Sequence, residues 1–321
     1  KKLEIRFSSL KQQASQSGNV MIRVLENAYK FLRFYIVGGF LVRSVNEIKK
    51  AINSIIELDT SLTELNKVVD ISNERISKFV DEAYELGNTL GRTGKQVIDA
   101  TTDFARAGYT LEESFKLSKA ALLMMNVAEG INTVEEASSS LISVLRSYKM
   151  EVSDAVKIVD ILNAVSNTSA TNFDNLSEGL RRTAGTLSQT GTSLEELTGL
   201  LVGGFEPLRN IEQVSSGLVM ISQRLRGIGE DGEAIEGLMP KLQEDFMRIS
   251  NISIIDPETG GLRSTFDILQ DMAKVFPTLT DMQRQYLSEL AAGNRQVKVL
   301  NAILDNWENV EKAVKNATTS T

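Results

Sequence analysis

Histidine and cysteine are both missing from this sequence of 321 residues. The chain therefore lacks the commonest zinc ligands, the usual general base and the thiolate nucleophile. Proline is also scarce, with 4 residues, and aromatic residues make up only 6% of the chain. Few prolines and few aromatic residues favour helix over sheet. These absences predict an all-helical structural or assembly protein rather than an enzyme, with no cofactor and no metal site.

The charge balance is acidic, with a formal net charge of −7 and a pI near 5.0. Phosphate binding needs clustered Lys and Arg, so we expect no specific binding of nucleic acid. The absence of cysteine leaves the redox compartment open. Because the chain begins at Lys1 rather than Met and ends in a polar stretch at Thr321, we expect a segment of a longer protein.

Apolar residues at helical spacing predict one long helix from Val20 to about Glu57, with a kink, a break or a close crossing at its two adjacent glycines, 38 and 39. Its most apolar stretch, 34–42, would span about 14 Å as helix, whereas a bilayer core needs roughly 30 Å. We therefore expect a buried helix or a contact between copies, with a membrane-active segment as the alternative. The residues assigned to this membrane or self-association segment are Phe31, Phe34, Tyr35, Ile36, Val37, Phe40, Leu41 and Val42.

From residue 59 onward the sequence predicts helices that begin with capping boxes. In such a box a hydroxyl accepts a free backbone N–H, and an acid or amide three residues later reaches back. Short links rich in Gly, Asn and Ser join these helices, which is typical of antiparallel helix hairpins. The fold class we expect is all-α, an array of antiparallel helix hairpins preceded by a long N-terminal helix. The predicted boxes are Thr93 with Gln96, Thr110 with Glu113, Thr133 with Glu136, and Ser193 with Glu196.

The C-terminal part contains the one strand-like run after residue 59, and a turn with a proline and two glycines follows it. A small β-hairpin near 252–263 would fit this pattern. Further helices are expected from Thr265, from Thr280 and from about Asn294, the last continuing through the single tryptophan, Trp307, to Val314. Trp307 is expected in the core.

Two pairs of similar segments favour two related multi-helix units, without establishing a duplication. Ala107–Glu113 resembles Thr190–Glu196, and Glu136–Leu141 resembles Gln213–Leu218. The predicted organisation is an N-terminal segment 1–58 with the long helix, a helical-hairpin core 59–250 with two related units, and a segment 251–321 with the turn and the last helices.

Motifs that could carry chemistry fit structural roles better. Gly227–Gly232 matches G-x-G-x-x-G, but a helix precedes it and its two acids would repel phosphates, so we interpret it as a loop between helices. Gly87–Gly94 lacks the Lys-Ser or Lys-Thr pair of a P-loop and is interpreted as a helix C-cap. The pairs Arg181–Arg182 and Arg224–Arg226 are interpreted as solvated faces or interhelix ion pairs.

From about Ile48 to Asn316 the order of several segments resembles the core of tail tape measure proteins from long-tailed bacteriophages and prophages. The segments that carry the resemblance are Ala107–Glu113, Asn163–Ala170, Thr190–Glu196, Asp256–Arg263, Phe266–Leu269 and Leu290–Gln296. The signature positions within them are Gly108, Thr110, Glu113, Asp256, Gly260, Gly261, Arg263, Gly293 and Arg295.

The resemblance implies a homo-oligomeric component of the virion tail lumen, present in the host cytoplasm during assembly. It would template tail tube assembly, bind assembly chaperones and tail-tip proteins, and leave the tail at DNA ejection, with membrane contact as a further expectation. A helix hairpin doubles back and spans little length, whereas a continuous helix extends by about 1.5 Å per residue. Thr60–Asn316 is therefore expected to form a compact hub, and the part of the protein that measures tail length, the ruler, is expected outside it. The alternatives are a helical membrane-active effector or tether and a muralytic, glycan-cleaving enzyme, for which no carboxylate stands out.

Overall fold

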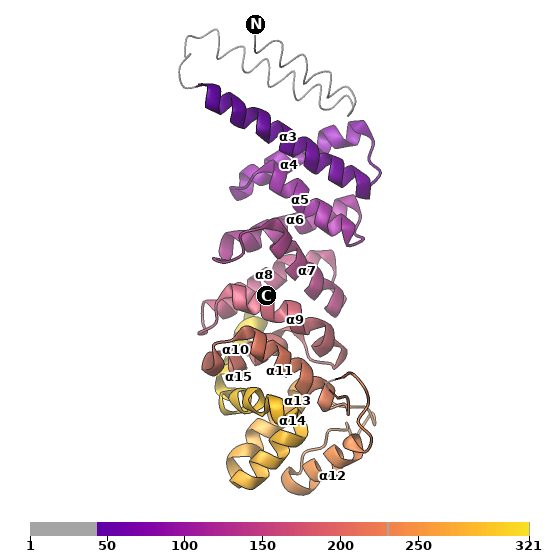
Figure 1. The fold of residues 1–321 in the computed structure, drawn as a ribbon, viewed down its shortest axis with the longest axis vertical. Coiled ribbons are helices and arrows are strands. Elements are labelled where there is room, and N and C mark those ends of the chain that lie inside the picture. The colour runs from indigo at the N-terminus through magenta and orange to yellow at the C-terminus, as the bar shows by residue number, and fades with distance from the viewer. Residues whose placement is uncertain (1–43, 230, 321) are drawn as a thin grey trace. The chain divides into compact units, whose positions relative to one another are not determined.

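The computed structural model describes residues 44–229 and 231–320, and within these ranges the chain is all-α (Figure 1). This confirms the predicted fold class. The described residues divide into two compact units between Leu122 and Leu123, inside α6. The α-helices are α3 (Ser44–Val68), α4 (Asn73–Leu90), α5 (Gly94–Arg106), α6 (Leu111–Val127), α7 (Val134–Tyr148), α8 (Ala155–Ser166), α9 (Phe173–Gln189), α10 (Leu194–Leu208), α11 (Ile211–Arg224), α12 (Leu238–Ser250), α13 (Thr265–Val275), α14 (Asp281–Asp305) and α15 (Trp307–Thr319). Two short 3₁₀ turns, η1 (Val152–Asp154) and η2 (Phe276–Thr278), precede α8 and follow α13.

The helix starts follow the capping pattern expected from the sequence. All four predicted capping boxes are formed. At the start of α10, for example, Ser193 Oγ accepts the Glu196 N–H at 3.2 Å, and the Glu196 carboxylate accepts the Ser193 N–H at 2.8 Å. Thr280, predicted only as a helix start, forms a fifth box with Gln283 at the start of α14.

One type of turn recurs where α4, α5 and α9 end. Gly91, Gly108 and Gly191 have φ of 67°, 92° and 77°, a left-handed conformation that an L side chain rarely adopts. In each turn the N–H that follows the glycine donates to the carbonyl five residues earlier, and a capping residue comes next. The similarity between Ala107–Glu113 and Thr190–Glu196 therefore corresponds to the same local structure.

In the first unit alternate helices pack in parallel. Ser61 and Glu64 of α3 bond to Asp99 and Arg106 of α5 in the same order along both helices, at 2.6 and 2.8 Å. Phe79 of α4 meets Phe115 of α6 edge to face, with ring centroids 5.7 Å apart. Successive helices reverse direction through the tight turns, so each hairpin stacks on the next.

The second unit has the same kind of helix arrangement within itself. Arg182 of α9 and Thr190, which caps its C-terminus, contact Glu212 and Ser222 of α11 in the same order, at 2.6 and 3.3 Å. Helix α7 lies beside α9 in the same way, and α15 packs on α10 and α8. Helices related in this manner are typical of helical-hairpin arrays, as expected from the sequence.

The C-terminal part differs from the sequence prediction in two places. The possible hairpin near 252–263 is reduced to a single antiparallel bridge between Ile255 and Leu262. The helix expected from Asn294 to Val314 is interrupted at Asn306, which separates α14 from α15, so that prediction was wrong. The physical reason is a tertiary contact, because the Asn306 side-chain amide donates to the Gly203 carbonyl at 3.2 Å and to the Glu206 carboxylate at 3.1 Å.

Other sequence predictions for single elements can be compared directly. The helix expected to end near Glu57 continues to Val68 as α3, and the part of it before residue 44 lies outside the described residues. Gly91 forms the predicted C-cap of α4. Trp307 is 9% exposed and packs on Phe266, which confirms its place in the core. The assignment of 1–58, 59–250 and 251–321 as separate segments stays a prediction.

Candidate functional site

The loop 256–263, which contains four of the positions assigned to the family resemblance, is a compact turn held by its first residue. The Asp256 carboxylate accepts the Glu258 N–H at 2.9 Å and the Thr259 hydroxyl at 2.9 Å. These bonds, the first above all, lower the pKa of Asp256. The Asp256 carbonyl accepts the Gly260 N–H, and the Asp256 N–H donates to Gly261. The structure thus brings three signature positions together in one turn.

Arg263 fastens this loop to α13. Its guanidinium donates to the Ser253 carbonyl at 2.9 Å and to the Asp271 carboxylate at 2.7 Å. Burial raises the pKa of Asp271, but hydrogen bonds from Arg263 and Lys274 outweigh burial and lower the pKa overall. The fourth signature position of the loop is therefore an anchor rather than an exposed contact.

Arg226, just beyond the end of α11, lies at the centre of a polar cluster. Its guanidinium donates to the Thr190 and Arg263 carbonyls at 3.0 and 3.4 Å, and to the Thr265 hydroxyl at 3.0 Å. A further bond reaches the Ser222 carbonyl at 3.1 Å, and the hydroxyls of Thr190, Ser222 and Thr265 bond to one another. Burial lowers the pKa of Arg226 to about 10. The cluster joins the α9–α10 turn, the end of α11 and the start of α13.

Arg224, two residues earlier at the end of α11, contacts the signature segment Leu290–Gln296. Helix α14 is kinked at Gly293, whose φ of 67° and ψ of 160° are not helical. Nε of Arg224 donates to the Leu290 carbonyl at 3.0 Å, next to this kink. A side chain at position 293 would meet the Arg224 side chain at about 3.5 Å in addition to the strained φ. Arg224 and Arg226 therefore connect loop 256–263 to the kink.

The sequence interpretation of these two arginines was wrong. They are half-buried, and their hydrogen bonds go to backbone carbonyls and a threonine hydroxyl rather than to carboxylates. Their position at a helix C-terminus was a usable signal, because basic side chains there often satisfy free carbonyls. By contrast, Arg181 and Arg182 do form ion pairs, with Glu178 and, between helices, with Glu212.

The remaining signature positions lie elsewhere. Gly108, Thr110 and Glu113 form the turn and capping box between α5 and α6, in the first unit. Arg295 is exposed just after the kink of α14. The segment from Phe31 to Val42, assigned to membrane contact or self-association, lies outside the described residues.

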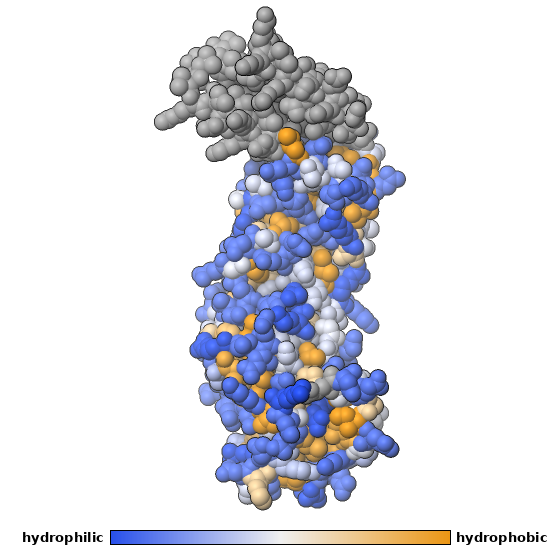
Figure 2. Space-filling view, viewed as in Figure 1, coloured by the Kyte–Doolittle hydropathy of each residue, from blue (hydrophilic) through white to orange (hydrophobic). Residues whose placement is uncertain are grey.

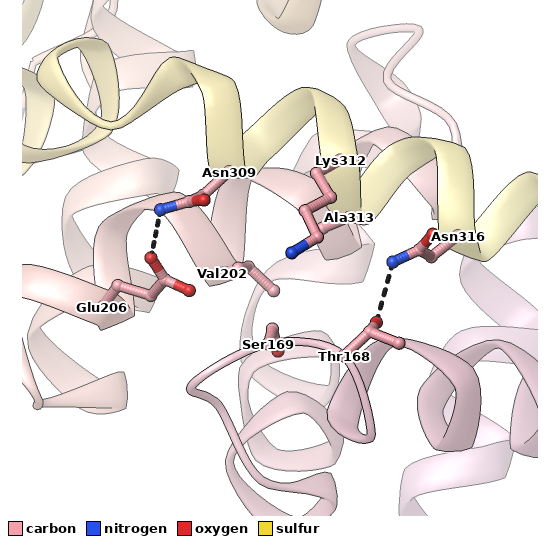
Figure 3. A pocket seen from close by; sticks show the side chains of 8 residues that line it. All are labelled: Thr168, Ser169, Val202, Glu206, Asn309, Lys312, Ala313 and Asn316. Carbon is pink, nitrogen blue, oxygen red and sulfur yellow. Dashed lines mark hydrogen bonds between the residues drawn. The ribbon is translucent and has the colours of Figure 1, made fainter.

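A polar cleft lies between α10, α15 and the α8–α9 loop (Figure 3). Asn316 donates to the Thr168 hydroxyl at 2.8 Å at one end of it, and Asn309 donates to the Glu206 carboxylate at the other. Its cavity volume of about 20 Å³ leaves room for about one water molecule and is far below the roughly 300 Å³ at which small-molecule sites begin. The cleft is a seam between helices rather than a ligand pocket.

The described residues offer little for other chemistry. Among them no group of acidic side chains is arranged to hold a metal ion. Within the same ranges, none of the helices combines the length and apolar character needed to cross a bilayer. The visible face is predominantly hydrophilic, with small separate apolar areas (Figure 2). The polar side chains described above join helices and loops to one another.

Comparison with known proteins adds an independent finding. A family model described as phage-related minor tail protein matches residues 80–293, about two-thirds of the chain. The match runs from α4 to the kink of α14, and so includes the turn at Gly108, the Arg226 cluster and loop 256–263. No solved structure matches the chain.

Proposed function

Because the chain belongs to the phage-related minor tail protein family, we propose that it is the folded core of a tail tape measure protein. In this role it acts through contacts and not as an enzyme. It templates assembly of the tail tube, binds assembly chaperones and tail-tip proteins, and stays in the tail lumen until DNA ejection. During assembly it resides in the host cytoplasm. The family match over the helical hairpins is the observation that carries the proposal.

The hairpin geometry supports a hub rather than a ruler for these residues. A ruler made of one helix gains about 1.5 Å for every residue. Helices α4 to α13 contain only 11 to 18 residues each, and the chain reverses at the turns between them. Removing a hairpin would therefore remove contacts, with little change in the distance spanned.

Deletion of α9 and α10, residues 173–208, from the gene in a phage or prophage would test this role. These helices contact α7, α8, α11 and α15, so their loss should prevent tail formation. Lysates examined by electron microscopy should contain few or no tails. Gly185→Ala in the same gene is the matched control, because position 185 is exposed, and it should give normal tails.

A different result would contradict the proposal. Tails that form and are shortened in proportion to the 36 deleted residues would mean that the hairpins themselves measure length. Tails of normal number and length would mean that this part of the chain is not needed for assembly.

A further inference from the structure

Helix α15 lies in a close groove on α10. Gly199 and Gly203, one helical turn apart on α10, leave room for its backbone. A Cβ at Gly199 would lie 2.5 Å from Cγ2 of Val314 and 2.9 Å from the carbonyl oxygen of Val310. The two helices run antiparallel, and α15 packs on α10 and α8 with few contacts to α14. Helix α15 therefore packs mainly on α10 and α8, which are distant in sequence, and much less on α14, which directly precedes it.

A single residue separates α15 from α14. Asn306 has φ of −111° and ψ of 27°, and the residues on both sides are helical. A modest rotation toward about −63° and −42° would make the backbone continuous. The apolar residues are already spaced by three or four across the break, at Leu300, Leu304, Trp307 and Val310. That spacing suits one uninterrupted helix as well as two.

We propose that Asn306 is a hinge, and that α15 of one copy docks in the α10 groove of a second copy of this chain. When the hinge straightens, α15 leaves its own groove as the end of a continuous helix. The groove residues Gly199, Val202 and Gly203 are buried beneath α15. When α15 leaves, this apolar surface is exposed to water until another helix packs on it. An identical helix from another copy restores every contact, and such exchange is a low-cost route to a dimer. This exchange between copies does not depend on a role in the tail.

The chain contains no cysteine, so introduced cysteines can report the exchange without background. Thr168 and Asn316 join the α8–α9 loop to α15 by a 2.8 Å hydrogen bond. One preparation carries Thr168→Cys alone and a second carries Asn316→Cys alone. After mixing, concentration and oxidation, exchange predicts more disulfide between the two variants than either variant forms with itself, because docking of α15 on a second copy brings positions 168 and 316 of different copies together. The double variant, which should close within one chain, calibrates the geometry.

Two hinge variants separate exchange from other association. Glu308 is exposed in the first turn of α15, where proline is tolerated, but Glu308→Pro in a continuous helix costs about 3 kcal/mol, which is about a hundredfold in population. Asn306→Ala removes the bonds to Gly203 and Glu206 and favours helix, so it should raise the exchanged fraction about tenfold or more. Both are measured by mixed disulfide yield and by light scattering after size exclusion.

The expected result is a mixed disulfide and a dimer that Asn306→Ala increases and Glu308→Pro abolishes. Absence of a mixed disulfide and of a dimer in Asn306→Ala would overturn the proposal. A dimer of equal abundance in both hinge variants would also overturn it, because association would then not depend on the hinge. Thermal unfolding of each variant confirms that it is folded.

Discussion

Substitution of Gly199 by alanine should weaken the second unit, although alanine is the better helix former. The helix propensity of alanine favours the folded state by about 1 kcal/mol. Against this, the new methyl group would lie 2.5 Å from a Val314 methyl and 2.9 Å from the backbone oxygen of Val310. A backbone atom cannot turn aside as a side chain can, so α15 must shift, at the upper end of the 1–3 kcal/mol that overpacking usually costs. We expect a net loss of about 1–2 kcal/mol.

Gly185→Ala is the matched control for this change. Position 185 is also inside a helix, but the nearest atom to its added Cβ is Ser147 Oγ at 3.9 Å. Only the higher helix propensity of alanine remains, so this variant should be more stable by about 0.5–1 kcal/mol. Both variants replace a glycine in a helix by alanine, but the expected changes in the free energy of unfolding have opposite signs.

The assay uses the single tryptophan. Trp307 begins α15 and packs on Phe266, with ring centroids 5.4 Å apart, so its fluorescence reports unfolding of the second unit. For a unit of this size 1 kcal/mol corresponds to about 2–4 °C in Tm. Gly199→Ala should lower Tm by about 2–8 °C, and Gly185→Ala should raise it by about 1–4 °C. If both variants raise Tm, then α15 does not approach α10 as closely as described, and the account of the groove is refuted.

Three further changes have definite expected outcomes. Arg226→Ala leaves four acceptors without their donor and should lower the free energy of unfolding by about 2–4 kcal/mol in urea titrations; an unchanged value would mean that the cluster adds nothing. The lowered pKa of Asp256 stabilises the fold above the unfolded value of about 4, and this contribution is lost as pH falls through the folded pKa. The pH dependence of stability between about 5 and 3 should therefore be shallower in Asp256→Asn, and equal slopes would contradict it. The paired changes Ile36→Asp and Leu41→Asp should reduce self-association or liposome leakage by the chain; if neither changes, the segment has no such role and local burial suffices.

Local signals in the sequence were sufficient to predict most helix starts. A capping box lies within four residues, so Ser193 and Glu196 could be recognised without knowledge of the rest of the chain. The start of a new helix near Asn294 was also predicted, and the kink at Gly293 lies next to it. Trp307 was assigned to the core from its place in an apolar stripe, which the structure confirms.

The features that could not be predicted depend on residues far apart in the sequence. The break at Asn306 is held by Glu206, 100 residues earlier, and one non-helical residue leaves the apolar spacing unchanged. Arg226 owes its burial to Thr190 and Thr265, which lie 36 and 39 residues away. The position of Arg226 just after a helix favours contacts with free carbonyls, but no pattern within α11 shows that segments so far away provide them.

The order of synthesis leaves the groove on α10 uncovered for a time. Helix α10 is complete at residue 208, but the helix that covers it ends at residue 319. At a synthesis rate of about 5–20 residues per second, roughly 5–20 s separate the two events. During that interval a newly made chain presents Gly199 and its apolar neighbours to whatever protein is near. The groove is thus open to other chains at the ribosome for longer than a helix takes to form.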